Sequence, residues 1–359
     1  MSDIARFDGW LQDEGPAALV LREWLQPVDG ADGVVFPATF AANEDSRKFA
    51  GGYNIDRFPD GSSICLLDSV GSQANRIEPL FGKDRYRALV PDVRIRAGDH
   101  EVSILEAGHR AADAVVRCSE LRDELRQAFE AALAHDALPL AKLAPTSIVF
   151  GVWDSRETQA KLPRLVSSTI RAFDVLELTR SAQYVPALDY VGNGVVEEPA
   201  DTKGKKALAE RGFAHVPSSA APGGIIARGG IRRDAVLSLA ALRPLSAKGG
   251  DTETRKLQRY ILGLALVAFS APAESYLRQG CMLVADPARG RTVEVVQPDG
   301  SRAPLVLSHA EALEYAKAAA ADFVVGKDRR VEFDATAARE ELALDGEKKK
   351  LGKKEKAKK

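Results

Sequence analysis

The chain has 359 residues, of which 45% are hydrophobic and 28% charged, and its formal net charge is −1. This composition is typical of a globular protein with a sizeable core, in one large domain or two small ones. No run approaches the ~20 apolar residues of a membrane-spanning helix, and residues 1–11 lack the features of a secretory signal, so we expect a cytoplasmic protein without a membrane partner.

Charge is spread unevenly along the sequence. Residues 347–359 carry eight lysines and two glutamates, a net +6, so residues 1–346 carry −7. A site for a polyanion must therefore be a local groove, because the body as a whole is acidic. The aromatic content of 6% argues against binding dominated by base stacking.

The hydrophobic pattern of the first 80 residues predicts two helices and two strands. A short helix is expected at 9–26 and a strand at 33–40. A polar, turn-rich and mobile insertion follows at 41–61. A strand at 63–67 then leads into a helix at 69–80.

The middle of the chain alternates irregularly. Short strands are expected at 93–96 and 101–106, a long helix at 110–135, and a buried strand at 146–153. Residues 161–184 fit a helix, and a strand at 172–178 fits about as well.

The second half of the chain begins with residues 192–230, which are rich in glycine, proline, serine and lysine and predict a long flexible excursion. The remaining expected elements are a strand at 232–242, a helix at 253–269, strands at 282–285 and 292–296, and a helix at 309–323. The end, from about Leu344, is of low complexity and is expected to be disordered.

This irregular alternation favours an α+β fold with a ferredoxin-like or RRM-like sheet over a doubly wound fold. We divide the chain into an N-terminal helical extension at 1–32, a main domain at 33–335 and a lysine-rich disordered tail at 336–359. The main domain would carry insertions at about 41–61 and 192–230.

Polar side chains recur at helical spacing on the helix predicted at 69–80. Ser69, Ser72, Gln73 and Arg76 follow the pattern i, i+3, i+4, i+7, with Asn75 beside them. This stripe has one cation and no carboxylate, whereas a solvated face normally mixes Glu and Lys. We therefore expect it to meet an anion or a polymer backbone.

A second group of arginines has uncharged hydrogen-bonding neighbours. If residues 161–184 form a helix, Arg164, Ser167, Ser168 and Arg171 repeat the spacing of the first stripe, and Arg180 follows further along. Arginine pairs bidentately with phosphate, and serine or amide groups contact phosphate and 2′-hydroxyl oxygens. The alternative is that these residues are ordinary exposed faces, caps or internal hydrogen bonds.

Signals for catalysis, metals and cofactors are weak. The five histidines and three cysteines show no metal-ligand spacing, and the cysteines are expected to be reduced structural thiols. No nucleophile elbow or phosphate-binding glycine loop is present. Asp68 is better explained as a helix-capping residue than as a metal ligand or catalytic carboxylate.

Three blocks, at residues 67–76, 149–155 and 167–171, resemble the backbone subunit of type I-U (also called I-G) CRISPR surveillance complexes, a branch of the RAMP superfamily. The resemblance spans roughly residues 33–325. It implies a modified RRM-like palm with inserted finger regions and a thumb-like hairpin. It also implies a non-catalytic protein that binds the guide RNA (crRNA) without a cofactor.

The implied partners are crRNA, target DNA through the guide, further copies of the chain in a helical filament, other effector subunits and a recruited helicase–nuclease. The residues that match the family's RNA-binding positions are Ser69, Ser72, Gln73, Asn75, Arg76, Arg164, Ser167, Ser168 and Arg171. Two alternatives remain: a metal-dependent ribonuclease of the same superfamily that positions its ion with Asp68 or a loop aspartate, and a protein scaffold without nucleic acid.

Overall fold

The fold is α+β, and its centre is one twisted antiparallel sheet. The computed structural model describes residues 4–45 and 47–343. The strands of the sheet, in spatial order, are β12 (Tyr276–Arg278), β13 (Cys281–Ala285), β1 (Ala18–Pro27), β11 (Val216–Ser238), β10 (Val166–Tyr184), β5 (Ser63–Asp68) and β4 (Ile55–Arg57). β14 (Thr292–Val296) continues beside β13 along the same edge of β1, and β15 (Arg302–Pro304) pairs with β14.

The prediction of a helix at 9–26 was wrong, because most of this segment is strand β1. Only a short turn of helix, η1 (Asp8–Leu11), precedes the strand. Leu19, Leu21 and Leu25 are buried at two- and four-residue spacing, the period of a strand with one covered face. The strand pairs with residues more than 200 positions later, and this pairing is invisible to local periodicity.

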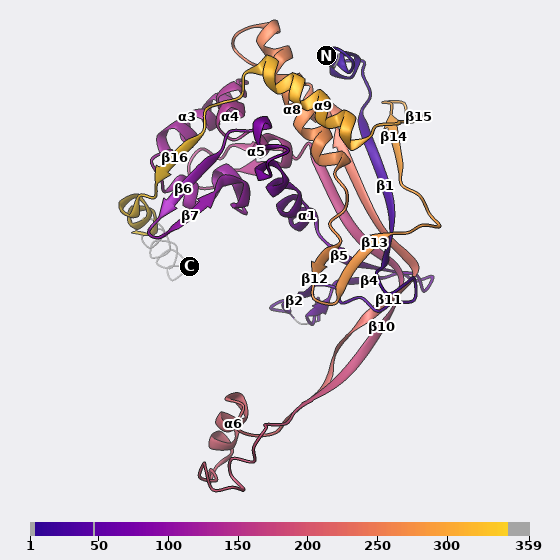
Figure 1. Ribbon diagram of the computed structural model, residues 1–359, viewed down its shortest axis with the longest axis vertical. Coiled ribbons are helices and arrows are strands. Elements are labelled where there is room, and N and C mark those ends of the chain that lie inside the picture. The colour runs from indigo at the N-terminus through magenta and orange to yellow at the C-terminus, as the bar shows by residue number, and fades with distance from the viewer. Residues whose placement is uncertain (1–3, 46, 344–359) are drawn as a thin grey trace, which may run out of the picture.

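Strands β10 and β11 form a long hairpin that leaves the body of the molecule (Figure 1). The strand alternative at 172–178 is therefore confirmed, and the helix interpretation of residues 161–184 was wrong. The segment expected to be a flexible excursion holds the helix α6 (Thr202–Glu210) at the far end of the hairpin and the first half of β11. The strand expected at 232–242 ends at Ser238, where the short helix α7 (Leu239–Leu242) begins.

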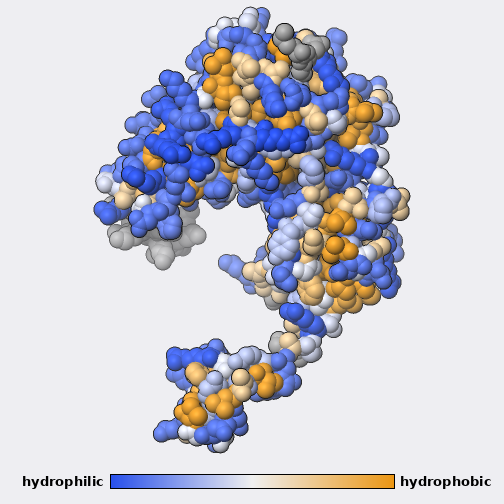
Figure 2. Space-filling view, viewed as in Figure 1, coloured by the Kyte–Doolittle hydropathy of each residue, from blue (hydrophilic) through white to orange (hydrophobic). Residues whose placement is uncertain are grey.

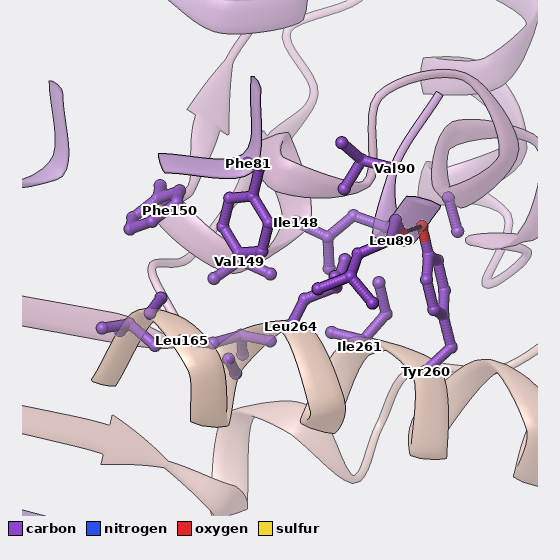
Figure 3. Close-up of a cluster of buried hydrophobic side chains, with 14 of the residues drawn as sticks. Phe81, Leu89, Val90, Ile148, Val149, Phe150, Leu165, Tyr260, Ile261 and Leu264 are labelled. Carbon is purple, nitrogen blue, oxygen red and sulfur yellow. Dashed lines mark hydrogen bonds between the residues drawn. The ribbon is translucent and has the colours of Figure 1, made fainter. Parts of the chain in front are cut away.

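Helices cover one face of the sheet, which we call the inner face. They are α1 (Val70–Ile77), α5 (Pro145–Phe150), α8 (Asp251–Ser270) and α9 (His309–Phe323). Figure 3 shows Phe81, Val149 and Phe150 gathered on the side of α8 that carries Leu264, with Leu165 below Phe150. Gly263 lets α9 approach α8 closely, because a Cβ there would lie 2.9 Å from the Cα of Ala316.

The buried strand expected at 146–153 is instead helix α5 followed by β8 (Val152–Trp153). All six residues of α5 are buried, so its sequence shows no polar face. A short apolar run of this kind is equally compatible with a buried strand and a buried helix. Pro145 stands at the first helical position, where its missing N–H costs nothing.

A smaller sheet packs beside α2 (Ala114–Arg117), α3 (Arg122–Leu133) and α4 (Leu138–Leu143). Its strand order is β16 (Arg329–Glu332), β6 (Val93–Ala97) and β7 (His100–Ser103). The prediction of one long helix at 110–135 was wrong, because the chain forms two separate helices, α2 and α3, in this segment. There Ser119 bridges to Phe333 and the amide of Glu120 donates to the carbonyl of Glu332, so tertiary pairing overrides the helical pattern.

The predictions of strands at 63–67, 93–96, 282–285 and 292–296 and of helices at 253–269 and 309–323 are confirmed. The helix predicted at 69–80 is α1 continued by a 3-10 turn from Glu78, and the strand predicted at 101–106 ends at Ser103, where another 3-10 turn begins. The strand expected at 33–40 is reduced to an isolated bridge at Val35 and to β2 (Thr39–Phe40), and the insertion at 41–61 contains β3 (Gly52–Tyr53) and β4. The remaining short elements are β9 (Lys161–Leu162), η2 (Glu78–Gly82), η3 (Arg87–Leu89), η4 (Ile104–Glu106) and η5 (Arg110–Ala112). The prediction of a disordered tail at 336–359 was wrong at its start, because residues 335–343 are helical, and residues 344–359 lie outside the described part of the chain.

Candidate nucleic-acid interface

Helix α1 begins as its sequence predicts. The Oγ of Ser69 accepts a hydrogen bond from the amide of Ser72 at 3.2 Å, so Ser69 is the N-cap. Asp68 does not share this capping role. It is 2% exposed and lies directly beneath the first turn of the helix.

The polar side chains of the α1 stripe converge on the buried carboxylate of Asp68. Its Oδ1 accepts from the Oγ of Ser72 at 2.7 Å and from Nη2 of Arg278 at 3.2 Å. Its Oδ2 accepts from Nε2 of Gln73 at 2.7 Å and from Nε of Arg76 at 3.2 Å. Both oxygens are occupied by two donors each, so the geometry does not favour Asp68 as a metal ligand, and the stripe is not free of carboxylates as its sequence suggested.

The hydrogen-bond chain continues from α1 into the central sheet. Oε1 of Gln73 accepts from the Oγ of Ser168, which in turn accepts from Nε of Arg233, at 2.9 and 3.1 Å. Arg233 also donates to Glu23 at 3.2 Å and to the carbonyl of Ala271 at 2.8 Å. We call this chain, from Asp68 through Gln73 and Ser168 to Arg233, the buried polar network.

Gln73 and Ser168 are 3% and 4% exposed, so in this structure they contact protein and not a bound polymer. They tie α1 to β10 and β11, and we leave them out of the interface. Burial lowers the pKa of Arg233, and the neighbouring carboxylate of Glu23 opposes this shift.

Besides the N-cap Ser69, which is half-buried, three residues of the predicted α1 group reach the surface. Asn75 is exposed, and its Oδ1 accepts from Nη2 of Arg110 at 3.3 Å. Arg76 is one-quarter exposed and donates to the carbonyl of Leu277 at 2.6 Å. Ser72 is half-buried.

The second predicted group does not form one stripe, because its residues lie on a strand. Ser168 points to the inner face, whereas Ser167 and Arg171 point to the opposite face, which we call the outer face. Arg180 lies further along the hairpin, exposed, with its guanidinium 5.7 Å from the ring centre of Phe36. Arg164 precedes β10 and is exposed on the same side as Asn75.

Asn75 and Arg164 line one cavity of about 660 Å³ beside α1. We call it the Trp153 cavity, because Trp153 lies in its wall and is 56% exposed. Nζ of Lys161 lies 5.4 Å from the ring centre of Trp153. Among the described residues, those that line this cavity include cations and no carboxylate.

The backbone around this cavity is shaped for these side chains. Gly151 has φ +77°, and a Cβ there would lie 2.7 Å from Cγ of Arg164. Trp153 and Lys161 face each other across the β8–β9 pair. Asp154 holds the connecting turn; burial would raise its pKa, but hydrogen bonds from Thr158 and neighbouring amides outweigh this effect and lower it.

A buried ion pair supports the floor of the same cavity. Nε of Arg110 lies 2.7 Å from Oε2 of Glu78, and both side chains are at most 5% exposed. Arg110 also has φ +55°, an uncommon conformation for a residue with a side chain. Burial raises the pKa of Glu78 to about 7, against the opposing effect of Arg110.

A second cavity, of about 630 Å³, lies on the other side of α1. Arg76, Lys83, Tyr86 and Glu274 contribute to its lining, and Asn75 borders both cavities. Helix α1 therefore lies between these two cavities. In Figure 1 it lies on the concave side of the crescent that the body and the hairpin form. The surface along the concave side of this crescent is largely hydrophilic (Figure 2).

Sequence reasoning did not identify Lys161, His109 or Lys83 as site residues. Trp153 belongs to a block that supports the family resemblance, but its exposure could not be inferred from the sequence. Gly151, in the same block, packs closely against Arg164, so the block and this arginine line the same cavity.

Residues 19–177 match the model of a protein family described as CRISPR-associated protein GSU0053. The match covers less than half of the chain, and it includes α1 and every residue that lines the Trp153 cavity. No curated protein matches the chain. Within the described residues, no helix is both long and apolar enough to cross a membrane. The family match supports a CRISPR-associated protein.

Proposed function

We propose that this protein is a non-catalytic guide-RNA-binding subunit of a type I-U (I-G) CRISPR effector complex, and that several copies polymerise along one guide. The observation that carries the proposal is the Trp153 cavity, which combines exposed cations with amide and hydroxyl groups inside the segment that matches a CRISPR-associated family.

The two exposed cations of this cavity, Lys161 and Arg164, are free to meet phosphate, whereas Arg110 is buried in its ion pair with Glu78. Neither Lys161 nor Arg164 has a salt-bridge partner among residues 4–45 and 47–343. Arginine and lysine bind phosphate oxygens without regard to sequence, and the Asn75 amide adds donors for phosphate or 2′-hydroxyl groups. A guide strand held by its backbone keeps its bases available for pairing.

The buried polar network gives this surface a fixed position. It anchors α1 to the sheet, so Asn75 and Arg76 are presented without a conformational search. Preorganised donors lose less conformational entropy when a ligand binds. The network residues therefore act by positioning the surface, while the cavity residues make the contacts.

In the proposed complex the sheet and its helices form a RAMP-type palm, and the β10–β11 hairpin forms the thumb. The hairpin carries exposed apolar side chains near α6, including Tyr184, Val185 and Val195. A surface of this kind at the end of a long arm suits contact with a neighbouring copy or subunit. The acidic remainder of the body would face away from the strand.

The test is RNA binding by a Lys161→Ala/Arg164→Ala double variant, measured by fluorescence anisotropy with single-stranded RNAs of two unrelated sequences. We expect affinity to fall about tenfold or more for both RNAs, and the slope of log K against log salt to flatten by about 1.4, since two single-strand phosphate contacts are lost.

The matched control is Arg126→Ala/Lys317→Ala, which also removes two exposed cations but from outside the cavity, where each is paired with a carboxylate three residues away. This variant should bind RNA as the unmodified protein does. Equal affinity and equal salt slope in both double variants would overturn the proposal.

A further inference from the structure

A second polar surface lies on the outer face of the central sheet, away from α1. Three residues stand in register on neighbouring strands: Arg171 of β10 pairs with Arg232 of β11, which pairs with Trp24 of β1. All three are half-buried, and Arg22 next to them is exposed. The adjacent row carries Phe173, also half-buried.

Arginines and aromatic rings alternate on this surface. The Arg232 guanidinium lies 4.8 Å from the ring centre of Phe173 and 5.2 Å from that of Trp24. The Arg289 guanidinium lies 4.1 Å from the ring centre of Trp24. We call the row Phe173, Arg232, Trp24 and Arg289 the outer-face ladder.

The backbone is adapted to this ladder. Gly230 has φ +87°, and a Cβ at that position would collide with the Arg289 guanidinium. Arg289 also donates to the carbonyl of Gly229 at 3.3 Å and to Oδ2 of Asp286 at 2.7 Å. A glycine at position 230 therefore allows Arg289 to cross the strand and reach Trp24.

The charge of the surface is positive although the body is acidic. Asp234 is shared between Arg232 at 2.8 Å and Arg22 at 4.0 Å, and Asp286 pairs with Arg289. Arg171 donates to the hydroxyl of Thr169 at 2.8 Å and has no carboxylate partner among the described residues. The four arginines outnumber the two aspartates that pair with them, and with the exposed Asp174 beside Gly229 counted the excess is one positive charge.

The geometry points to a second site for single-stranded nucleic acid on this outer face. Guanidinium groups held over aromatic rings lose little side-chain entropy on binding, and the N–H groups of Arg232 and Arg289 that Asp234, Asp286 and Gly229 do not use remain for phosphate. Aromatic and guanidinium planes also accept stacked bases, as on other open sheet faces that bind single strands. The site is separate from the Trp153 cavity and does not depend on the function proposed for it.

The chain has three tryptophans, at positions 10, 24 and 153, and this allows each surface to be observed alone. A Trp10→Phe/Trp153→Phe variant keeps only the tryptophan of the outer face. A Trp10→Phe/Trp24→Phe variant keeps only that of the cavity. Each is titrated with a 15-nucleotide oligothymidylate while tryptophan fluorescence is recorded.

We expect the oligonucleotide to quench Trp24 with saturation. Arg171→Ala in the Trp24-only background should weaken this binding roughly fivefold, since one charge-assisted contact is lost. Arg171 does not contact Trp24, so the signal itself is preserved. The matched control is Arg302→Ala, an exposed arginine on β15 that is paired with Glu294, and it should leave the Trp24 titration unchanged.

An unchanged Trp24 signal at oligonucleotide concentrations that quench Trp153 would overturn the second site and leave the cavity proposal standing. Quenching of Trp24 alone would support the second site and count against the cavity. A Trp24 signal that follows protein concentration and ignores the oligonucleotide would also overturn the inference, because the face would then be a contact between copies.

Discussion

The two faces of strand β10 use the same residue types in opposite ways. On the inner face Ser168 is enclosed in the buried polar network, and its hydroxyl joins α1 to Arg233. On the outer face, Ser167 and Arg171 are half-buried, and Arg171 donates to the hydroxyl of Thr169. Residues one position apart therefore separate into structural and surface roles, because a strand sends alternate side chains to opposite faces.

The largest expected effect tests whether the inner face is structural. Asp68→Asn removes the charge that Arg76 and Arg278 share, and an amide cannot accept from all four donors. We expect the free energy of unfolding to fall by about 3 kcal/mol, as when one partner of a buried ion pair is removed. Urea denaturation measures this loss.

Asp60→Asn is the control, since Asp60 lies in an exposed turn and its change should cost little. Equal or higher stability of Asp68→Asn would show that the carboxylate is a strained functional group, as the ribonuclease alternative requires, and not the centre of the network.

Local sequence signals predicted the helix that carries the candidate site but not its surroundings. The Ser69 cap and the spacing of the polar residues were sufficient for α1. The contact of Gln73 with Ser168 joins residues 95 positions apart, and that of Ser168 with Arg233 a further 65, so no local pattern could reveal it. Assuming a helix for 161–184 placed Ser167 and Ser168 on one surface, and the strand places them on two.

The same limit applies to the fold and to the two proposed surfaces. Helices α8 and α9 were predictable because their apolar residues recur within one element. Strand β1 was not, because its partners come from the last third of the chain. Trp24 and Trp153 look like core residues in the sequence, and only the folded chain shows that each lies beside cations at the surface.

A change in pH should distinguish the two faces. The pKa of Glu78 is raised from its ordinary value to about 7 in the folded protein, so between these values the folded chain holds a proton that the unfolded chain has lost. The stabilisation that this bound proton gives the folded state is complete at pH 4.5 and below, and it is lost as the pH rises through about 7. The loss is at most about 3 kcal/mol.

The measurement compares the unmodified protein with Glu78→Gln by urea denaturation at pH 5 and pH 7.5. The unmodified protein should lose more stability over this interval than the variant, because other titrating groups are common to both. Parallel pH profiles would contradict the assignment. On the outer face a hydrogen bond from Arg289 lowers the pKa of Asp286, so this carboxylate stays charged at both pH values. Oligonucleotide quenching of Trp24 should therefore not change with the titration of Glu78.

The smallest expected effect is the most direct comparison of the two faces, because it changes neighbouring serines. Ser168→Ala leaves Oε1 of Gln73 and Nε of Arg233 without their shared partner inside the protein, and each is a buried polar atom. We expect a loss of about 1–2 kcal/mol in the free energy of unfolding. Ser167→Ala, one residue away on the outer face, should change it by less than about 0.5 kcal/mol. If the two substitutions lower the free energy of unfolding equally, the buried polar network does not stabilise the packing of α1 on the sheet. The assignment of a structural role to the inner face and a surface role to the outer face would then be wrong.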